Sequence, residues 1–411
     1  MIKLNKTKPY FISKKIVYEA YKKVKAKRGA SGVDNESIKD FERNLWGNLY
    51  KIWNRMSSGS YFPPPVLQVE IPKAQGGKRK LGIPTVADRI AQMVVKIYLE
   101  PELERHFVDD SYGFRPQKSA LQAVEKAKER CREYKWVLDI DIKGFFDNID
   151  HQLLRKAIEK HTDCSWIKLY IKRWLQAPIQ KQNGEIEART KGTPQGGVIS
   201  PLLANLFLHY AFDKWMQNNH SAILYERYAD DIIVHCSTEA EANRLKQSIA
   251  KRLEECHLHM HPTKTKIVHC ACVSKIKEHS SRKFTFLGYT FKPRRGRTRA
   301  GVNYTKFTPA VSSEATNKMI STIKKRTLIH QSHITIQALA DNINPIMRGW
   351  MNYFGQFDKS AMQRMLSHLN LSLIKWVERK YKKGMRRARK WLVQVAEKLP
   401  NLFAHWRQAK P

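Results

Sequence analysis

The chain has 411 residues, of which 42% are hydrophobic and 27% are charged, and this length allows two or three domains with cores of their own. Lysine and arginine number 75 against 37 aspartates and glutamates, and the formal net charge of +38 exceeds what solubility requires, so it predicts a polyanionic partner. No apolar run approaches the roughly 18 residues of a membrane helix, and no signal-peptide core follows the Lys-rich start, so we expect a soluble, cytoplasmic protein with no membrane partner.

The first part of the chain is predicted to be basic and helical up to about residue 62. Three prolines, Pro63 to Pro65, end it because proline cannot continue a helix. A β-hairpin is predicted next, since residues 66–73 alternate apolar and polar side chains, Gln75-Gly76-Gly77 supplies a turn and residues 78–83 return. Two helices are then predicted, over residues 90–103 and 119–133.

An acidic strand is predicted at residues 137–142, which read Val-Leu-Asp-Ile-Asp-Ile. Side chains alternate faces along a strand, so Leu138, Ile140 and Ile142 share one face while Asp139 and Asp141 share the other. Carboxylates on a mostly buried strand are costly unless a cation or a basic partner neutralises them. The second face is therefore a candidate cation site.

A second acidic element follows a helix predicted over residues 151–176, a glycine-rich loop at 192–197 and a helix that Pro201 opens. It is the tetrapeptide Tyr228-Ala229-Asp230-Asp231, between two predicted strands. Such an Asp-Asp pair is either a solvated turn or part of a metal site. Together with Asp141 it offers hard oxygen ligands, which suit Mg²⁺ because that ion takes one or two carboxylates and completes its shell with water and substrate phosphate.

A cluster of zinc-ligand residue types follows a helix predicted over residues 239–254: Cys256, His257, His259, His261, His269, Cys270 and Cys272. The alternation of the first three histidines with Leu258 and Met260 is equally typical of an amphipathic strand with one solvated face. Both interpretations stay open. The six cysteines include no Cys-x-x-Cys pair, so we expect reduced thiols and no disulfides.

The remaining chain is predicted to form short strands at 258–260, 267–269 and 284–291, then a basic link at 292–299, then helices. This order predicts an α+β fold with a split βαβ sheet covered by helices on one face. We expect a helical extension over residues 1–65, a sheet domain over 66–291 and a helical domain over 292–411. Eight of the twelve residues from Arg379 to Lys390 are basic, which predicts phosphate binding.

Several of these segments resemble the reverse transcriptases. Similar to that family's palm motifs are Asp141 with Phe145-Phe146-Asp147, the loop 192–197 with Ser200 to Asn205, and Tyr228 to Asp231; similar to its fingers are Ile71-Pro72-Lys73, residues 79–85 and Ser111 to Pro116. The stretch from Ile343 to Phe354 resembles the maturase, or thumb, motif of proteins encoded by bacterial group II introns. The resemblance implies a right-hand polymerase with fingers and palm, followed by an α-helical thumb or maturase domain.

The resemblance also implies roles at the reaction centre. Asp141, Asp230 and Asp231 would be the catalytic residues that hold two Mg²⁺ ions, or Mn²⁺ in their place, and Asp139 would support them. Lys73 and Arg79 would hold the triphosphate of a deoxynucleotide, unless they are solvated edge charges. Phe146 would exclude a 2′-hydroxyl as a steric gate, unless it is a core aromatic, and Gln195 would lie against the nucleotide's sugar and base.

Further residues are expected to touch nucleic acid. Tyr228 and Ala229 would lie beside the primer end, Lys264 and its neighbour Lys266 would contact phosphate, and Arg115 would either contact the template or form a structural salt bridge. The residues expected to bind RNA in the C-terminal part are Arg348, Arg379, Lys380, Lys382, Lys383, Arg386, Arg387, Arg389 and Lys390.

The implied function is that of an RNA-directed DNA polymerase of a group II intron, which also binds the intron RNA and assists its splicing and mobility. Its partners would be intron RNA, an RNA template with a DNA primer, deoxynucleoside triphosphates and target DNA. Two alternatives stay open: a splicing cofactor with an idle polymerase site, and a domesticated reverse transcriptase acting in defence or repair. No cysteine follows Cys272, so we expect no Cys/His-rich endonuclease domain, and mobility would need a primer supplied from elsewhere.

Overall fold

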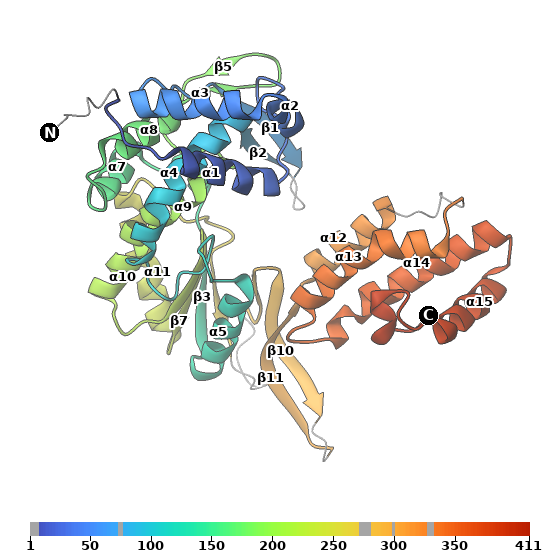
Figure 1. The fold of residues 1–411 in the computed structure, drawn as a ribbon. Helices are drawn as coiled ribbons and strands as arrows, with labels where there is room; N and C mark the ends of the chain where they lie inside the picture. Colours follow the sequence, from blue (N-terminus) through green and yellow to red (C-terminus); the bar gives the residue numbers. More distant parts are fainter. Residues whose placement is uncertain (1–7, 73–76, 271–280, 298–300, 327–332) are drawn as a thin grey trace. The chain divides into compact units, whose positions relative to one another are not determined.

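The chain folds into two compact units, seen here in a computed structural model that describes residues 8–72, 77–270, 281–297, 301–326 and 333–411 (Figure 1). The first unit contains Met1–Ala123 and Leu138–Lys266, and the second contains Val124–Val137 and Ile267–Pro411. Lys73 and Cys272 lie outside the described residues. In the described ranges, no helix is both long and apolar enough to cross a membrane.

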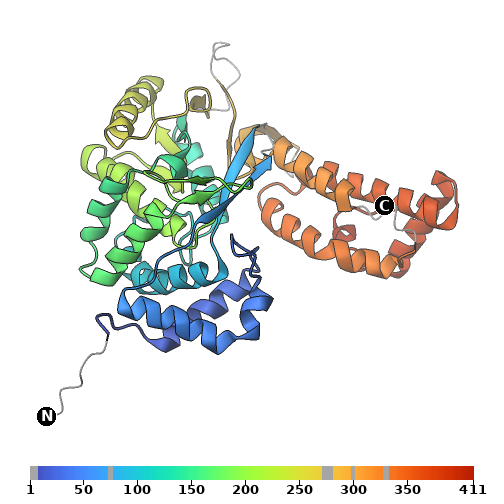
Figure 2. The ribbon, with the colours of Figure 1, turned by 90° about the horizontal axis from the view of Figure 1, so that it is seen from above.

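Three helices open the first unit: α1 (Lys14–Ala26), α2 (Ile38–Arg43) and α3 (Leu45–Ser58). The apolar positions of α1, Val17, Ala20 and Val24, are buried, and the helix packs on α3 and on α4 (Val86–Glu104) (Figure 2). Helix α3 ends where Gly59 adopts a φ of +76°, a left-handed conformation that glycine adopts without steric cost. The predicted helical start is therefore confirmed.

The predicted hairpin is formed by β1 (Val66–Pro72) and β2 (Lys78–Ile83), which pair antiparallel from Leu67↔Ile83 to Pro72↔Lys78. Two short strands, β4 (Ile179–Gln180) and β5 (Ile186–Glu187), extend this sheet in the order β2-β1-β4-β5. The sheet therefore joins the hairpin to a segment about one hundred residues later, which the sequence pattern did not indicate.

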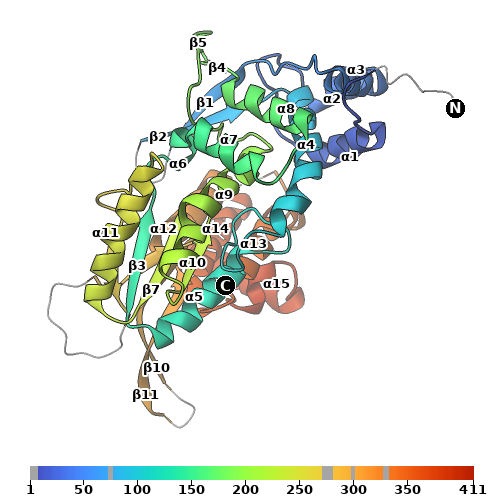
Figure 3. The same ribbon diagram turned by 90° about the vertical axis from the view of Figure 1, so that its left-hand side faces the viewer.

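The second sheet has the order β6-β7-β3-β8, with β3 (Trp136–Asp141), β6 (Tyr225–Tyr228), β7 (Asp231–Cys236) and β8 (Lys266–His269). Helix α11 (Glu239–Glu255) packs against β7 (Figure 3). The other helices of this region are α5 (Ala120–Glu133), α6 (Phe145–Asn148), α7 (His151–Glu159), α8 (Ser165–Gln176), α9 (Ser200–Leu208) and α10 (Lys214–Asn219). A π-helical turn, His209–Asp213, joins α9 to α10.

Two expectations for this region are wrong. The single helix predicted over 151–176 is broken into α7 and α8, because the hydroxyl of Thr162 accepts a hydrogen bond from Cys164 N at 3.2 Å and so favours a turn. The strand predicted at 258–260 is reduced to one isolated bridge, Ile142↔Met260, and His257 before it has a φ of +58°, which an extended strand does not allow.

The second unit contains an antiparallel sheet in the order β11-β10-β9, built from β9 (Phe284–Phe286), β10 (Tyr289–Arg297) and β11 (Asn303–Val311). The expected basic link at 292–299 is, in its described part, strand β10, which pairs with β11 as far as Arg297↔Asn303. A helical region follows as expected, with α12 (Ser313–Arg326), α13 (Ile336–Phe354), α14 (Gln363–Tyr381), α15 (Met385–Lys398) and the short turns Ser360–Met362 and Ala404–Arg407.

Candidate active site

The predicted acidic turn is a two-residue hairpin loop. Tyr228 pairs with Asp231, which leaves Ala229 and Asp230 as the loop, and Ala229 has a φ of +56°, as this kind of tight loop requires at one or both positions. Gly113 packs directly beneath the loop, since a Cβ there would overlap Ala229 N and lie 2.9 Å from the carbonyl carbon of Tyr228. Only a glycine fits at this position without moving the loop.

A buried polar network fixes the same loop from below. Arg227, fully buried on β6, donates from Nε to Asp213 Oδ1 at 2.8 Å and also pairs with Asp213 through Nη2. Its Nη1 donates to Asn205 Oδ1 at 3.1 Å and to Ala229 O at 3.3 Å, and Asn205 in turn donates to Gly113 O at 2.6 Å. We did not predict this network, although an arginine on a buried strand signals a buried partner by the same argument that we applied to Asp139.

The three predicted acids interact electrostatically. Asp231 still reaches solvent, but the protein around it displaces water, and this effect together with the charges of Asp230 and Asp141 raises its pKa to about 7. Loss of water also raises the pKa of Asp230, and the charge of Asp141 adds to it. Burial, and after it the charge of Asp231, raises the pKa of Asp139 to about 8. The acids of two distant segments therefore share one site.

Three cations compensate this charge in part. Lys264 Nζ lies 3.4 Å from Asp141 Oδ2, an ion pair in which both side chains are partly exposed. Lys264 and Arg79 lower the pKa values of Asp230 and Asp231, and Lys266 lowers that of Asp139. Loss of water remains the largest effect on the pKa values of Asp139, Asp230 and Asp231. The three cations therefore do not fully neutralise these carboxyl groups, and a further cation would stabilise them.

The acids fit a divalent ion by their chemistry. In the part of the chain that is described, no three His, Cys, Asp or Glu side chains are gathered so that they could jointly hold a metal. Mg²⁺ does not need such a cage, because it usually binds one or two carboxylates together with water and phosphate. Dehydrated, mutually repelling carboxylates are a donor set that such an ion stabilises. Asp141, Asp230 and Asp231 would be its ligands.

The described members of the His/Cys cluster face different partners. His257 Nδ1 lies 3.0 Å from Asp150 Oδ2, His261 Nδ1 lies 3.3 Å from the Thr263 hydroxyl, and the His269 ring packs on Trp136 with 4.6 Å between centroids. The predicted alternation of the first three histidines along a strand is also absent, because no strand is formed at the described residues 257–261. These residues therefore give no support to the zinc interpretation.

Phe146 and Gln195 are brought to the same part of the first unit. Phe146 is half-buried, its ring packs edge-on against Phe145 at 5.4 Å, and its carbonyl accepts a hydrogen bond from Thr193 N at 2.8 Å. Gln195 is tied to β2 because its carbonyl accepts from Gly82 N at 2.9 Å. Arg79, on the same strand, is exposed and close enough to influence the acids.

Arg115 is a structural residue, which corrects the expectation of a template contact and agrees with the alternative. Its side chain is buried, and Nε and Nη2 donate to Glu104 Oε1 at 2.9 and 2.6 Å. Nη1 donates to the carbonyls of Ser111, at 2.6 Å, and Val108. Every nitrogen of the guanidinium is thus used within the protein.

The basic run of the second unit is not one helix. Lys382, with a φ of +50°, ends α14, and α15 begins after Gly384. Lys380 is bound inside the protein, because Nζ donates to Ile334 O at 2.7 Å and lies 5.4 Å from the centre of the Trp376 ring. The other expected RNA-binding residues are exposed, except for the half-buried Lys383: Arg348, Arg379, Lys382, Arg386, Arg387, Arg389 and Lys390.

Comparison with known proteins defines the class. Residues 71–291, more than half of the chain, match the reverse transcriptase (RNA-dependent DNA polymerase) family. The chain belongs to this family. Residues 316–393 also match the group II intron maturase-specific domain, which agrees with the resemblance seen at Ile343 to Phe354.

Individual relatives agree with this assignment. The chain is 33% identical to Protein YkfC of Escherichia coli (strain K12) over 276 residues, which cover 58% of this chain and 72% of YkfC. It is 37% identical to the group II intron-encoded protein LtrA of Lactococcus lactis subsp. cremoris over 203 residues, 49% of this chain but only 33% of LtrA. The retron Ec48 reverse transcriptase of Escherichia coli is 28% identical over 222 residues, 52% of this chain and 51% of that protein.

Proposed function

We propose that the protein is an RNA-directed DNA polymerase that works with a group II intron RNA, extending a DNA primer on an RNA template and assisting splicing of the intron. One observation carries the polymerase part: Asp141 raises the pKa values of Asp230 and Asp231 across two distant strands, in a site whose neighbouring cations compensate only part of the negative charge. The maturase-specific match at residues 316–393 and the intron-encoded relative support the intron part.

The reaction is attack of the primer 3′-oxygen on the α-phosphate of a deoxynucleotide, with pyrophosphate as the leaving group. Divalent ions held by Asp141, Asp230 and Asp231 would stabilise the charge that develops on the attacking and leaving oxygens. Arg79 provides a positive charge for the triphosphate, while the Phe146 ring and the Gln195 amide position the nucleotide. Phe146 limits the space at C2′, and Gln195 bears on the sugar and base.

The splicing role rests on the exposed cations of α14, α15 and the turn between them. Arg386, Arg387, Arg389 and Lys390 lie along the start of α15, with no acidic residue in its first turn. Such a surface neutralises RNA phosphates and favours the compact folded RNA over the extended one. The binding is therefore expected to weaken steeply with salt.

The central test is the variant Asp230→Asn, which keeps the shape of the side chain and removes its charge. Primer extension on an RNA template should fall at least about a hundredfold, because charge stabilisation by bound metal is worth several kcal/mol. Binding of intron RNA should be unchanged. Asp109→Asn is the matched control, since the Asp109 side chain is fully exposed and makes only a surface contact with Lys118. Undiminished extension by Asp230→Asn would reject the assignment of the acids.

The wild-type protein separates the remaining alternatives. RNA binding and splicing without any primer extension would identify a splicing cofactor with an idle polymerase site. Extension by a protein whose copurifying RNA, once sequenced, is not a group II intron would identify a reverse transcriptase with another cellular role.

A further inference from the structure

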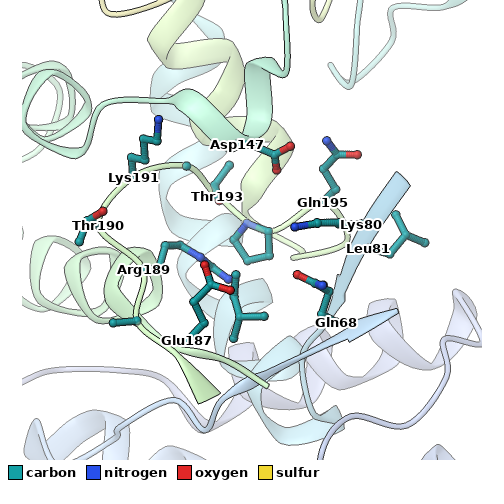
Figure 4. A pocket seen from close by; sticks show the side chains of 15 residues that line it. Gln68, Lys80, Leu81, Asp147, Glu187, Arg189, Thr190, Lys191, Thr193 and Gln195 are labelled. Atoms are coloured by element: carbon teal, nitrogen blue, oxygen red, sulfur yellow. The ribbon is translucent and has the colours of Figure 1, made fainter. Parts of the chain in front are cut away.

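A cavity of about 340 Å³ lies beside Gln195, within the first unit (Figure 4). One wall is strand β2 at Lys80, Leu81 and Gly82, and the opposite wall is the segment from Glu187 to Gln195. None of Asp141, Asp230, Asp231 and Arg79 lines it. The cavity is therefore next to the proposed nucleotide site but separate from the acids and from the cation that faces them.

Backbone contacts hold the cavity walls in place. Gly192 N donates to Ile149 O and Thr193 N donates to Phe146 O, both at 2.8 Å. These hydrogen bonds fix the wall segment from Glu187 to Gln195 to α6 and to the residue that follows this helix. On the other side Gly196 approaches β2 so closely that a Cβ there would lie 2.5 Å from Gly82 O. The cavity is thus a built feature that needs no rearrangement to receive a ligand.

Arg189 enters the cavity with an unused hydrogen-bond donor. Its Nη1 is buried and has no hydrogen-bond partner among the described residues. Loss of water lowers the pKa of Arg189 to about 10, and only the charge of Asp147 acts against this. A buried cationic donor without a partner is destabilising and calls for an explanation, and a ligand that accepts its hydrogen bond is one.

The other charges of the cavity define the ligand. Lys80 and Lys191 add positive charge, although Lys191 Nζ already donates to Asn148 Oδ1 at 2.9 Å, whereas Asp147 and Glu187 add negative charge. An arginine fork suits phosphate oxygens. The two carboxylates repel a highly charged triphosphate more strongly than a phosphodiester, which carries a single charge. The chemistry therefore favours one phosphate of a nucleic-acid strand.

We propose that this cavity holds a single phosphodiester of the template strand, with Arg189 Nη1 donating to a phosphate oxygen. The inference rests on the proposed polymerase function, because the cavity adjoins Gln195, which would bear on the incoming nucleotide. The template base must pair with that nucleotide, so the template backbone must pass close to Gln195. Arg189 acts here as a binding residue for the template and not for the triphosphate.

The test replaces template phosphates one at a time. RNA templates each carry one uncharged 2′-deoxy methylphosphonate linkage, at positions from three nucleotides upstream to three downstream of the templating base. Extension rates, and affinities for the primer–template measured in EDTA, are compared for the wild type, Arg189→Gln and the matched control Arg155→Gln, at an exposed arginine of α7 that does not line the cavity. At one position the wild type and the control should lose roughly tenfold or more in both measurements, as for a hydrogen bond to a charged group.

Arg189→Gln should show the same loss on the unmodified template and no further loss at that position. Arg189→Lys keeps the positive charge but lacks the paired donors of the guanidinium. Its loss at that methylphosphonate position should lie between those of the wild type and Arg189→Gln, which would show that the site is folded. Equal sensitivity of the wild type and Arg189→Gln at every position would overturn the proposal, and so would a defect confined to the KM for the deoxynucleotide. No extension by the wild type on unmodified template would instead reject the polymerase function, and this site with it.

Discussion

At the scale of single residues, the clearest prediction concerns Phe146. Its ring packs against Phe145 and its carbonyl accepts a hydrogen bond from Thr193 N, so the residue is held in place; in its proposed role the ring would face C2′ of the nucleotide sugar. Phe146→Val shortens the side chain and opens space for a hydroxyl. The preference for deoxynucleotides over ribonucleotides should fall by roughly 10- to 200-fold, the range for small steric differences in a pocket. Single-nucleotide incorporation with each triphosphate measures it.

Phe41→Leu provides the comparison for this variant. Phe41 is buried in α2 and packs on Tyr21 rather than on Phe146, so its truncation costs stability without changing the space beside the sugar. It should therefore lower incorporation of both kinds of nucleotide to the same extent. An unchanged sugar preference in Phe146→Val would assign that ring to the core and remove its role as a gate.

The sequence predicts the acids of the candidate site better than it predicts their supports. Asp139 and Asp141 stand out because charge on an apolar strand needs an explanation, and the structure gives one. Asp213 and Arg227 form a fully buried pair whose members are 14 positions apart, and Asp213 ends a π-helical turn that no periodicity predicts. Arg189 lies in an irregular segment, where only three-dimensional burial shows that its Nη1 has no partner.

At the scale of elements, the hairpin loop of β6 and β7 depends on the segment below it. Gly113→Ala places a methyl group against the backbone of Tyr228 and Ala229, which cannot move aside as a flexible side chain would. The loop that carries Asp230 must shift. Extension activity should fall by on the order of a hundredfold, as for a displacement of about 1 Å at a reaction centre, while circular dichroism stays like that of the wild type.

Gly349→Ala is the matched change for this experiment. Gly349 lies inside α13, and no atom lies within 4 Å of a Cβ added there, so this variant should keep full activity and gain slightly in helix stability. Full activity in Gly113→Ala would show that the loop tolerates displacement, against the positioning role of the glycine.

The β1–β2 hairpin was predicted correctly from local signals, whereas strand β10, which depends on its partner strand, was not. The β1–β2 hairpin has alternation and a glycine turn, and both strands are present. Strand β10 has arginines and lysine at four of its nine positions, which reads as a solvated link. It becomes a strand because β11 supplies partners along its whole length, from Val311 opposite Tyr289 to Asn303 opposite Arg297.

At the scale of the whole molecule, the chain contains two units with separate cores. The helical core of the second unit is built from residues between Val311 and Ala409, among them Leu366, Trp376 and Trp406. The domain boundaries expected from the sequence, at residues 65 and 291, stay a prediction. The boundary between the two compact units after Lys266 lies in the same part of the chain as the second of them. Composition suggested the second division, because basic residues become dense there and acidic residues become rare.

The second unit should lose stability in acid because of His405. This side chain is fully buried, its Nε2 lies 2.7 Å from Asn370 Oδ1, and Asn370 also donates to the carbonyls of Ala409 and Lys410, both at 3.1 Å. Burial lowers the pKa of His405 to about 3, below the value of about 6.5 in an unfolded chain. The unfolded state therefore binds more protons between these values, and stability is lost as the pH falls through this window.

His405→Gln keeps a donor for Asn370 and removes the titration. At pH 7.5 this variant should be equal to or less stable than the wild type, and the wild type's advantage should shrink by a few degrees in Tm as the pH is lowered to 4.5. His333→Gln, an exposed histidine of the same unit, should leave the difference constant across this range. A gap between wild type and His405→Gln that does not change with pH would mean that His405 takes up its proton in the folded unit, which its burial opposes.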